Sequence, residues 1–381
     1  MNNNSYICCY IKEHPDAWRD ELKNKQILIK ENNEHLAIFN YDIMADFSDP
    51  LVQEARGIIL NLDTLDVVCW PFRKFGNFGE SYADTIDWST ARVQDKIDGS
   101  IIKLWWNSIK NNWQFSTNST IDAGEAGCAS LAIADYAELV HNADNYHKIP
   151  FESLDRDKTY IFELTSPENK VVIRYEETHL WHIGTRNNNT GEESIDDIGI
   201  NKPDEYSLRS LDECVEAAKN LNHPGGAVEK EGFVVVDKNW HRIKIKSPDY
   251  LCVHRMIGNG NFSKRRVIEM IKTMDNGTLD NFSSDYPEYA VYIAYYRFKM
   301  AELARLIDNF SLYTKKLYEE YSHDRAAVAR EISSHPLSMF GFKTLDEKGH
   351  RGIDWIKILS VTQLEKLIPE YVLPGILDLK K

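Results

Sequence analysis

The chain of 381 residues lacks the features that mark membrane, secreted and fibrous proteins. No apolar run approaches the roughly 18–20 residues that cross a bilayer, since runs such as Gly232–Val236 are far shorter. Glycine and proline number only 19 and 12, which excludes collagen-like and low-complexity chains. The first residues carry no basic stretch ahead of an apolar run, so we expect no secretory signal and a cytoplasmic location.

Cysteine is also scarce, and the cysteines form no CxxC pair and have no histidine partners at zinc-binding spacing. A disulfide scaffold is therefore excluded. We interpret the cysteines as buried or incidental thiols of a reducing compartment. They are Cys8, Cys9, Cys69, Cys128, Cys214 and Cys252.

Positive charge is in deficit, because 45 Lys and Arg face 59 Asp and Glu, a net charge of −14. Such a surface repels polyanions, which disfavours a protein that coats nucleic acid but allows a local basic cleft. The deficit is uneven: residues 1–247 hold 26 basic and 41 acidic residues, whereas residues 248–381 hold 19 and 18. The length fits two domains, and these two parts differ in electrostatic character.

Short runs rich in β-branched and aromatic residues predict strands in the first 250 positions. The predicted strands are 27–30, 57–62, 67–70, 100–106, 113–116, 160–164, 171–175, 232–236 and 242–246. Apolar residues at helical spacing predict helices at about 123–141 and 210–222. We therefore predict that residues 1–250 form an α+β domain with large, mostly antiparallel sheets.

Beyond Ser247 the apolar spacing becomes helical throughout. The predicted helices are 267–274, 289–321, 324–332 and 361–368. Pro287 suits the first turn of the long helix, and Ser360 suits the N-cap of the last one. We predict that residues 251–381 form an all-α domain.

One short motif stands directly before a predicted strand, the pentapeptide Lys96–Ser100 of sequence KIDGS. Alone it is more often a surface turn than a site. Other charged or glycine-containing elements at predicted strands change this interpretation; in order they are Arg56-Gly57, Phe72–Asn77 with Lys74 and Phe75, Glu163, Glu231-Gly232 and Lys244-Ile-Lys246. Strand geometry places Lys244 and Lys246 on one face, where both can address one anion.

This ordered set resembles the motifs of the covalent nucleotidyltransferase superfamily of ligases and capping enzymes, and most closely those of the bacteriophage RNA ligase 1 family. The resemblance covers about residues 50–250, and beyond residue 255 only the helical character. It implies a nucleotidyltransferase domain followed by a helical RNA-specificity domain. Branches with an OB-fold after the lysine pair would need further strands, and the sequence predicts none there.

The resemblance implies an ATP-dependent RNA ligase in which Lys96 is the nucleophile and forms a lysyl-AMP. An ordinary lysine has a pKa of about 10.4 and is protonated at neutral pH, so it has to be activated. We expect burial and nearby cations to lower the pKa of Lys96. The cations expected to converge there and to hold the triphosphate are Arg56, Lys74, Lys244 and Lys246, of which the last two would also act in catalysis.

The remaining motif residues bind nucleotide or metal by the same resemblance. Glu163 would bond a ribose hydroxyl, and Glu231 would orient Lys96 or bind the metal, with Glu163 as the other candidate metal ligand. Gly99 would leave room for the nucleotide because it has no Cβ. The other expected nucleotide contacts are Phe75, Asp98 and Ser100. Magnesium, for which manganese can substitute, is implied because a triphosphate needs its charge neutralised.

Four features depart from the family pattern or leave a choice open. Arg73 stands where the family usually has proline. The strand 115–120 lacks a lysine that relatives tend to place there, so a nucleotide contact is either missing or supplied by Lys103. Tyr250 packs against the active site or is an ordinary core residue. The aromatic face for the adenine is one of Phe162, Phe75, Phe233 and Trp113.

The implied partner is RNA with 5′-phosphate and 3′-hydroxyl ends, such as a tRNA broken in its anticodon loop. We expect a monomer without a membrane partner, located in host cytoplasm if a phage encodes it. Basic residues 264–266 and aromatic residues such as Phe262 and Phe298 could contact RNA, although helical aromatics are more often core. The competing functions are a DNA ligase, an mRNA guanylyltransferase and an inactive tRNA-binding relative.

Overall fold

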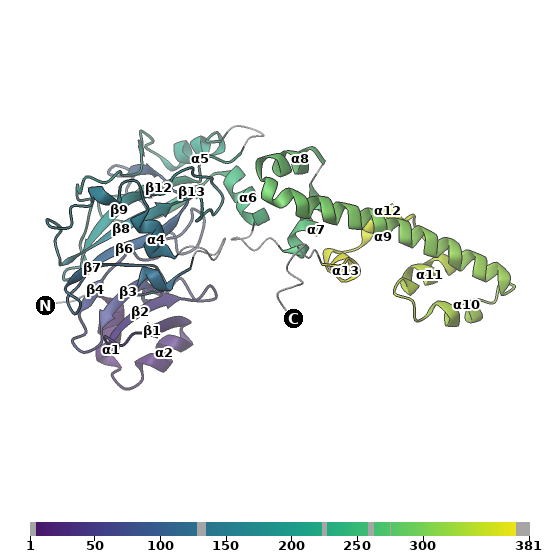
Figure 1. The fold of residues 1–381 in the computed structure, drawn as a ribbon, viewed down its shortest axis with the longest axis horizontal. Coiled ribbons are helices and arrows are strands. Elements are labelled where there is room, and N and C mark those ends of the chain that lie inside the picture. Colours follow the sequence, from purple (N-terminus) through teal and green to yellow (C-terminus); the bar gives the residue numbers. More distant parts are fainter. Residues whose placement is uncertain (1–4, 128–134, 223–226, 258–262, 275, 371–381) are drawn as a thin grey trace. The chain divides into compact units, whose positions relative to one another are not determined.

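The structure is a computed structural model that describes residues 5–127, 135–222, 227–257, 263–274 and 276–370 (Figure 1). The chain divides into two compact units, the first formed by residues 1–223 with 228–255 and the second by residues from 256 onward. The division falls inside helix α6, Pro248–Ile257. The first unit contains strands and helices, whereas the second is helical throughout its described part.

The first unit is built on three sheets, and its named strands pair antiparallel throughout. The first sheet has the order β1-β2-β3-β4, with β1 Ile27–Glu31, β2 Leu36–Tyr41, β3 Arg56–Asn61 and β4 Val67–Cys69. The second has the order β10-β9-β8-β6-β7, with β6 Ser100–Asn107, β7 Asn112–Ser116, β8 Lys158–Thr165, β9 His179–Asn187 and β10 Glu193–Ser194. The third has the order β11-β5-β12-β13, with β5 Arg92–Asp95, β11 Glu205–Tyr206, β12 Gly232–Val236 and β13 Arg242–Lys246.

Eight of the nine predicted strands are confirmed to within two residues at each end. The strand predicted at 171–175 is wrong, because this segment is irregular. Its amides at Val172 and Ile173 donate to the carboxylate of Asp98, which replaces the partner strand that a β-ladder would need. The strands β2, β5, β9, β10 and β11 were not predicted.

Short helices complete the first unit: α1 Tyr6–Glu13, α2 Trp18–Asn24, α3 Pro50–Glu54, α4 Tyr136–His141, α5 Leu211–Lys219 and α6, with 3-10 turns at Ala123–Glu125 and Tyr146–Lys148. The helix predicted at 210–222 is confirmed as α5. The helix predicted at 123–141 is present only as the 3-10 turn and α4, and its part at 128–134, with Cys128, lies outside the described residues. The five described cysteines are all free.

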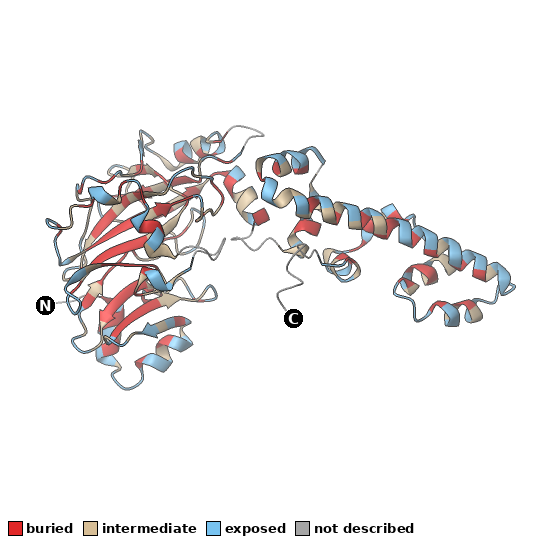
Figure 2. Cartoon of the chain, in the orientation of Figure 1, coloured by how far each residue is buried: buried red, intermediate tan, exposed pale blue. Residues whose placement is uncertain are grey.

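The core of the first unit lies on and between its strands, where Figure 2 shows the buried residues. On β13, Ile243 and Ile245 are buried in the core of the third sheet, while Lys244 and Lys246 alternate with them on the other face. The period-2 prediction for this strand is therefore confirmed. The α+β fold class with large antiparallel sheets is confirmed as well.

The second unit consists of α7 Lys264–Thr273, α8 Asn276–Asp285, α9 Pro287–Glu320, α10 Arg325–Ile332, α11 Ser338–Leu345, α12 Gly352–Ile358 and α13 Val361–Leu367. Pro287 occupies the first turn of α9, and Ser360 caps α13 in a reciprocal capping box, as predicted. The α9 helix has 34 residues, which at 1.5 Å per residue gives a length of about 51 Å. No helix in the described ranges is both long and apolar enough to cross a membrane.

Among the aromatic residues of α9, Phe298, which was considered for RNA contact, is exposed, whereas Tyr296 is buried in the core. Phe262 lies outside the described residues.

Candidate active site

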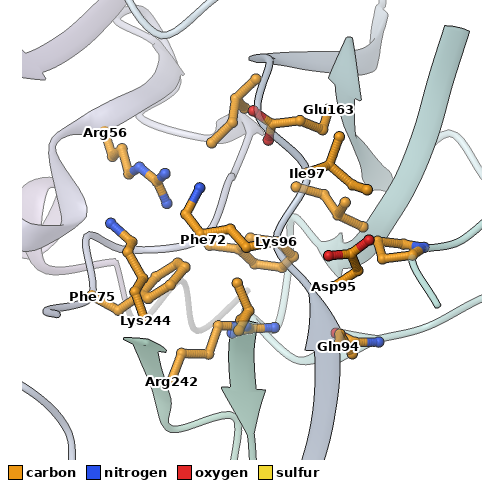
Figure 3. A pocket seen from close by; sticks show the side chains of 14 residues that line it. Arg56, Phe72, Phe75, Gln94, Asp95, Lys96, Ile97, Glu163, Arg242 and Lys244 are labelled. Atoms are coloured by element: carbon orange, nitrogen blue, oxygen red, sulfur yellow. The ribbon is translucent and has the colours of Figure 1, made fainter. Parts of the chain in front are cut away.

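A pocket in the first unit is lined by residues from all three sheets (Figure 3). Its lining residues are Arg56, Phe72, Phe75, Gln94, Asp95, Lys96, Ile97, Ile101, Glu163, Ile183, Pro203, Val234, Arg242 and Lys244. Its empty space measures about 660 Å³ when the part open to solvent is included. Figure 3 shows the nitrogen ends of Arg56, Lys96 and Lys244 converging on one side of the pocket.

Lys96 follows β5 and is held to the start of β12 by backbone and side chain. Its amide donates to the carbonyl of Gly232 at 2.9 Å. Its Nζ lies 2.7 Å from Oε2 of Glu231, and Nζ of Lys246 lies 2.9 Å from Oε1 of the same carboxylate. Glu231 is 2% exposed and bridges the two lysines, which are partly buried, so the three side chains form one charge cluster.

The prediction that Lys96 has a lowered pKa is wrong. Burial by itself favours the neutral amine, but the carboxylates around Lys96 outweigh it and raise its pKa above the ordinary value. Those carboxylates are, in decreasing order, Glu231, Glu163 and Asp98. Burial alone would likewise raise the pKa of Glu231, but Lys96 and Lys246 hold it below its ordinary value.

Lys244 is the lysine of the pocket whose charge is suppressed. Burial lowers its pKa to about 6, and neighbouring cations act in the same direction. Those cations are, in decreasing order, Arg56, Lys96, Lys74 and Lys246. Its Nζ lies 4.6 Å from the ring centre of Phe75, and the guanidinium carbon of Arg56 lies 5.4 Å from the same ring. Arg56 and Lys244 thus surround the ring of Phe75 at one side of the pocket, and we call these three residues the cationic wall.

Glu163 of β8 lines the pocket opposite this wall. Burial raises the pKa of Glu163 to about 7, and Lys96 only partly offsets this effect. Its carboxylate has no hydrogen-bond partner among the described residues, so it can accept a ribose hydroxyl or bind a cation. Within the described ranges, no group of three or more His, Cys, Asp and Glu is placed to hold a metal ion.

Asp98 does not line the pocket. Its carboxylate instead holds the KIDGS segment in place through hydrogen bonds to other parts of the chain. Its Oδ2 accepts the amides of Val172 and Ile173 at 2.9 Å each, and its Oδ1 accepts the hydroxyl of Tyr250 at 2.7 Å. Tyr250 is 1% exposed, so it is a core tyrosine that also supports the active-site segment. Both alternatives for Tyr250 thus hold together.

Gly99 and Ser100 also serve the packing of this segment. A Cβ on Gly99 would lie 2.3 Å from the carbonyl oxygen of Leu164, so close approach to β8 requires glycine here. Ser100 Oγ lies 3.1 Å from both the hydroxyl of Tyr136 and Oδ1 of Asn169. Neither Gly99 nor Ser100 lines the pocket.

Two predicted lysine positions differ from expectation. Lys74 does not line the pocket; its Nζ lies 4.8 Å from the ring centre of Tyr41 and 4.3 Å from that of Phe47. Lys103, considered as a substitute nucleotide contact, is fully buried, and its Nζ donates to the carbonyl of Gly57 at 2.6 Å. Arg73, at the atypical position, pairs with Asp84 at 2.6 Å.

Among the four aromatic candidates for the adenine face, only Phe75 lines the pocket. Phe162 and Phe233 are buried in the cores of the second and third sheets. Trp113 packs edge-on against Trp106. A second ring, Phe72, lines the pocket and was not among the candidates; the guanidinium carbon of Arg242 lies 4.0 Å from its centre.

Asp95 is a pocket residue that the sequence interpretation missed. One carboxylate oxygen pairs with Lys230, while the other, Oδ1, is buried and has no partner among the described residues. Asp95 pairs with Lys230, and the next residue, Lys96, pairs with Glu231. The two segments are thus joined by two adjacent ion pairs of opposite direction. The only sequence signal was its position next to Lys96 at the end of a strand that was itself not predicted.

Comparison with known protein families places the chain among the ligases. The family model described as RNA ligase matches residues 54–250, which is more than half of the chain. The chain therefore belongs to this RNA ligase family, and the resemblance to the bacteriophage RNA ligase 1 family is confirmed.

Relatives of known name agree with this family. A putative bifunctional polynucleotide kinase/RNA ligase of Autographa californica nuclear polyhedrosis virus is 33% identical over 288 residues, which cover 69% of this chain and 39% of that protein. A putative RNA ligase of Thermovibrio ammonificans is 28% identical over 251 residues, which cover 60% of each chain. The chain thus spans less than two thirds of either relative. A solved archaeal ATP-dependent RNA ligase covers 73% of this chain and 81% of its own, at 13% identity and a TM-score of 0.44, too distant to carry a conclusion.

Proposed function

We propose that the protein is an ATP-dependent RNA ligase that joins 5′-phosphate and 3′-hydroxyl ends of RNA. The observation that carries the proposal is the placement of Lys96 in the pocket, where it is bonded to Glu231 and faces the cationic wall of Arg56 and Lys244. Membership of the RNA ligase family supports it.

In the first step, Nζ of Lys96 attacks the α-phosphorus of ATP. The new N–P bond replaces the bond to the β-phosphate oxygen, and pyrophosphate leaves. Lys96 has to lose a proton to attack, and Oε2 of Glu231 at 2.7 Å is the acceptor within reach. Arg56 and Lys244 are placed to balance the charge that develops on the leaving pyrophosphate.

In the second step, a 5′-phosphate oxygen of RNA attacks the lysyl-AMP and frees Lys96, which gives a 5′-5′ pyrophosphate link. In the third step, a 3′-hydroxyl attacks the former 5′-phosphate, and AMP leaves. All three steps are displacements at phosphorus, for which positioning and charge matter more than covalent chemistry. Lysines, an arginine and carboxylates are suited to this task.

The residues present fit a divalent cation only together with the nucleotide. Glu231 already binds two lysines, whereas Glu163 has no hydrogen-bond partner among the described residues. Magnesium, with manganese as a substitute, commonly binds one or two carboxylates plus substrate phosphates, so Glu163 is its best ligand here. The ion would supply positive charge that neutralises the phosphates and favours the neutral form of Lys96.

The choice of ATP over GTP is supported by Asp95. Its buried and unpartnered Oδ1 can accept a hydrogen bond from the amino group of adenine, whereas it would repel the carbonyl oxygen of guanine. Phe75 and Phe72 provide ring faces within the same pocket.

Intact mass measured with and without magnesium and each nucleotide tests the proposal. We expect the mass to increase by one AMP with ATP, no increase with GTP, and no increase for Lys96→Ala. An adduct from GTP alone would identify a guanylyltransferase, and an adduct on Lys96→Ala would show that another residue is the nucleophile. No adduct with either nucleotide would support an inactive relative.

The RNA substrate and the role of the helical unit follow from the family resemblance. We propose that residues 251–381 select the RNA, and that a tRNA broken in its anticodon loop is the physiological substrate. Joining of 5′-phosphorylated single-stranded RNA, with DNA of the same sequence as control, tests the class of polymer. Equal or faster sealing of DNA would overturn the assignment to RNA.

A further inference from the structure

A positively charged side chain lies wholly beneath the cationic wall of the pocket. Lys103 of β6 is 0% exposed and is among the largest fully buried side chains of the described residues. Burial lowers its pKa to about 8, the neighbouring Cys69 opposes this shift, and the cation of Arg56 adds to it. An ammonium group is costly to bury, so a space-filling apolar residue would serve the core better.

Lys103 makes its one hydrogen bond to another described residue at a specific point of the backbone. Its Nζ donates to the carbonyl of Gly57 at 2.6 Å. Gly57 has a φ of +85°, and a Cβ there would lie 2.4 Å from Nζ of Lys103 and 2.8 Å from Cα of Asn118. The ammonium group therefore occupies the space that a side chain at position 57 would need.

The residue before Gly57 is Arg56, whose side chain lines the pocket. Among the described residues, the guanidinium of Arg56 has only a long contact of 3.5 Å to the carbonyl of Arg73 and a ring contact to Phe75. Because few contacts hold this side chain, the direction in which it points depends on the backbone of Arg56. Lys103 fixes that backbone at the next residue, through the carbonyl of Gly57.

We propose that Lys103 is a positioning residue for nucleotide binding, which holds Arg56 toward the phosphates of ATP by anchoring the carbonyl of Gly57. The inference rests on the proposed function, because it assumes that the pocket binds ATP. Lys103 itself does not line the pocket, so it acts through Arg56.

Binding of α,β-methylene ATP, which cannot release pyrophosphate, tests this role without the chemical step. Lys103→Met keeps the length of the side chain but removes its charge and its hydrogen bond. We expect its dissociation constant to rise about tenfold, with KM for ATP rising more than kcat falls in adenylylation. Lys110→Met removes a lysine from the turn after the same strand, where it pairs with Glu34, and should leave binding unchanged.

A double-mutant cycle with Arg56→Ala separates positioning from packing. If Lys103 acts through Arg56, then Lys103→Met should weaken binding no further once Arg56 is absent. Additive losses, or unchanged binding in Lys103→Met, would overturn the proposal. If Lys103→Met does not fold, Lys103→Leu, which also lacks the hydrogen bond to Gly57, takes its place in the same cycle with the same two deciding outcomes.

The proposed function and this inference can fail separately. A wild-type protein that binds the nucleotide analogue but never forms an AMP adduct would contradict the ligase proposal alone. A wild-type protein that forms the adduct, with the variant binding ATP normally, would contradict the role of Lys103 alone.

Discussion

Two lysines that line the pocket, Lys96 and Lys244, have opposite character. Lys96 shares the carboxylate of Glu231 with Lys246, and the pKa of Lys96 is raised. Lys244 lies near cations and an aromatic ring, and its pKa is lowered to about 6. Lys244 and Lys246 are two residues apart on the same face of one strand.

The comparison shows that the carboxylate partner, and not the number of nearby cations, decides which lysine keeps its proton. Before ATP binds, the proposed nucleophile is protonated and its neighbour is not. Nucleotide binding should change this balance, because the triphosphate adds negative charge mainly beside the cationic wall. Four experiments test this contrast.

Removal of the shared carboxylate should have the largest effect. Glu231→Gln leaves Lys96 and Lys246 without a negative partner in a buried position, so we expect a loss of about 3 kcal/mol in unfolding free energy. Misplacement of the nucleophile should slow AMP-adduct formation about 100-fold. Denaturant unfolding and the rate of adduct formation measure the two effects. Glu229→Gln, an exposed neighbour, is the control, and equal effects in both variants would contradict the role of Glu231.

Proton uptake on nucleotide binding should identify the neutral lysine. At pH 7.5 Lys244 is mostly uncharged, and bound phosphates favour its charged form, so α,β-methylene ATP should bind with uptake of about one proton. At pH 5.5 Lys244 is already mostly charged, and its uptake should fall to about a third or less. Calorimetry in buffers of different ionisation enthalpy measures the uptake.

Two matched variants assign this uptake to one lysine of the strand. Lys244→Met should remove the uptake, whereas Lys246→Met should retain it because the charge of Lys246 is balanced by Glu231. Uptake that persists in Lys244→Met would contradict the contrast between Lys96 and Lys244.

The pH dependence of stability should expose Glu163. Its pKa is raised to about 7 in the folded state from an ordinary 4.5, so the folded protein keeps a proton that the unfolded chain has lost. Stability of the ligand-free protein should therefore fall as the pH rises through this window, by about 2 kcal/mol more than in Glu163→Gln. Denaturant titrations from pH 4.5 to 7.5 measure the difference, and parallel curves for the two proteins would contradict the burial of this charge.

The smallest effect should come from an ion pair outside the pocket. Arg297 and Asp280 of the helical unit lie 2.7 Å apart, but Asp280 is 65% exposed. Arg297→Gln should lower the unfolding free energy by about 0.5 kcal/mol or less. Arg242→Gln, which breaks a pair with Glu193 that is 9% exposed on each side, should cost several times more by the same measurement.

The sequence predicted what local periodicity determines. The alternation of Ile243 and Ile245 with the two lysines follows from the strand period, and the caps of α13 and the start of α9 follow from residue type. The strand predicted at 171–175 does not form, because the amides of Val172 and Ile173 bond Asp98, a partner 74 and 75 residues away that no local pattern reveals.

The electrostatic state of the site was not predictable for the same reason. Lys96 and Glu231 are 135 residues apart, so the ion pair that raises the pKa of Lys96 depends on tertiary structure. Of the cations predicted from the sequence, Arg56 and Lys244 line the pocket, but their partners were not visible in the sequence. Lys74 shares the motif yet lies against Tyr41 and Phe47.

The close approach of Gly99 to Leu164 restricts which residues of the site can change during evolution. Because the carbonyl of Leu164 leaves no room for a Cβ, the fold would retain Gly99 even in a descendant that had lost its chemistry. Asp98 would persist on the same ground, since it anchors two amides and a tyrosine. Packing does not require a lysine at position 96. Substitution of Lys96, while the rest of the motif is retained, would therefore be the first sign of a ligase that has lost its activity.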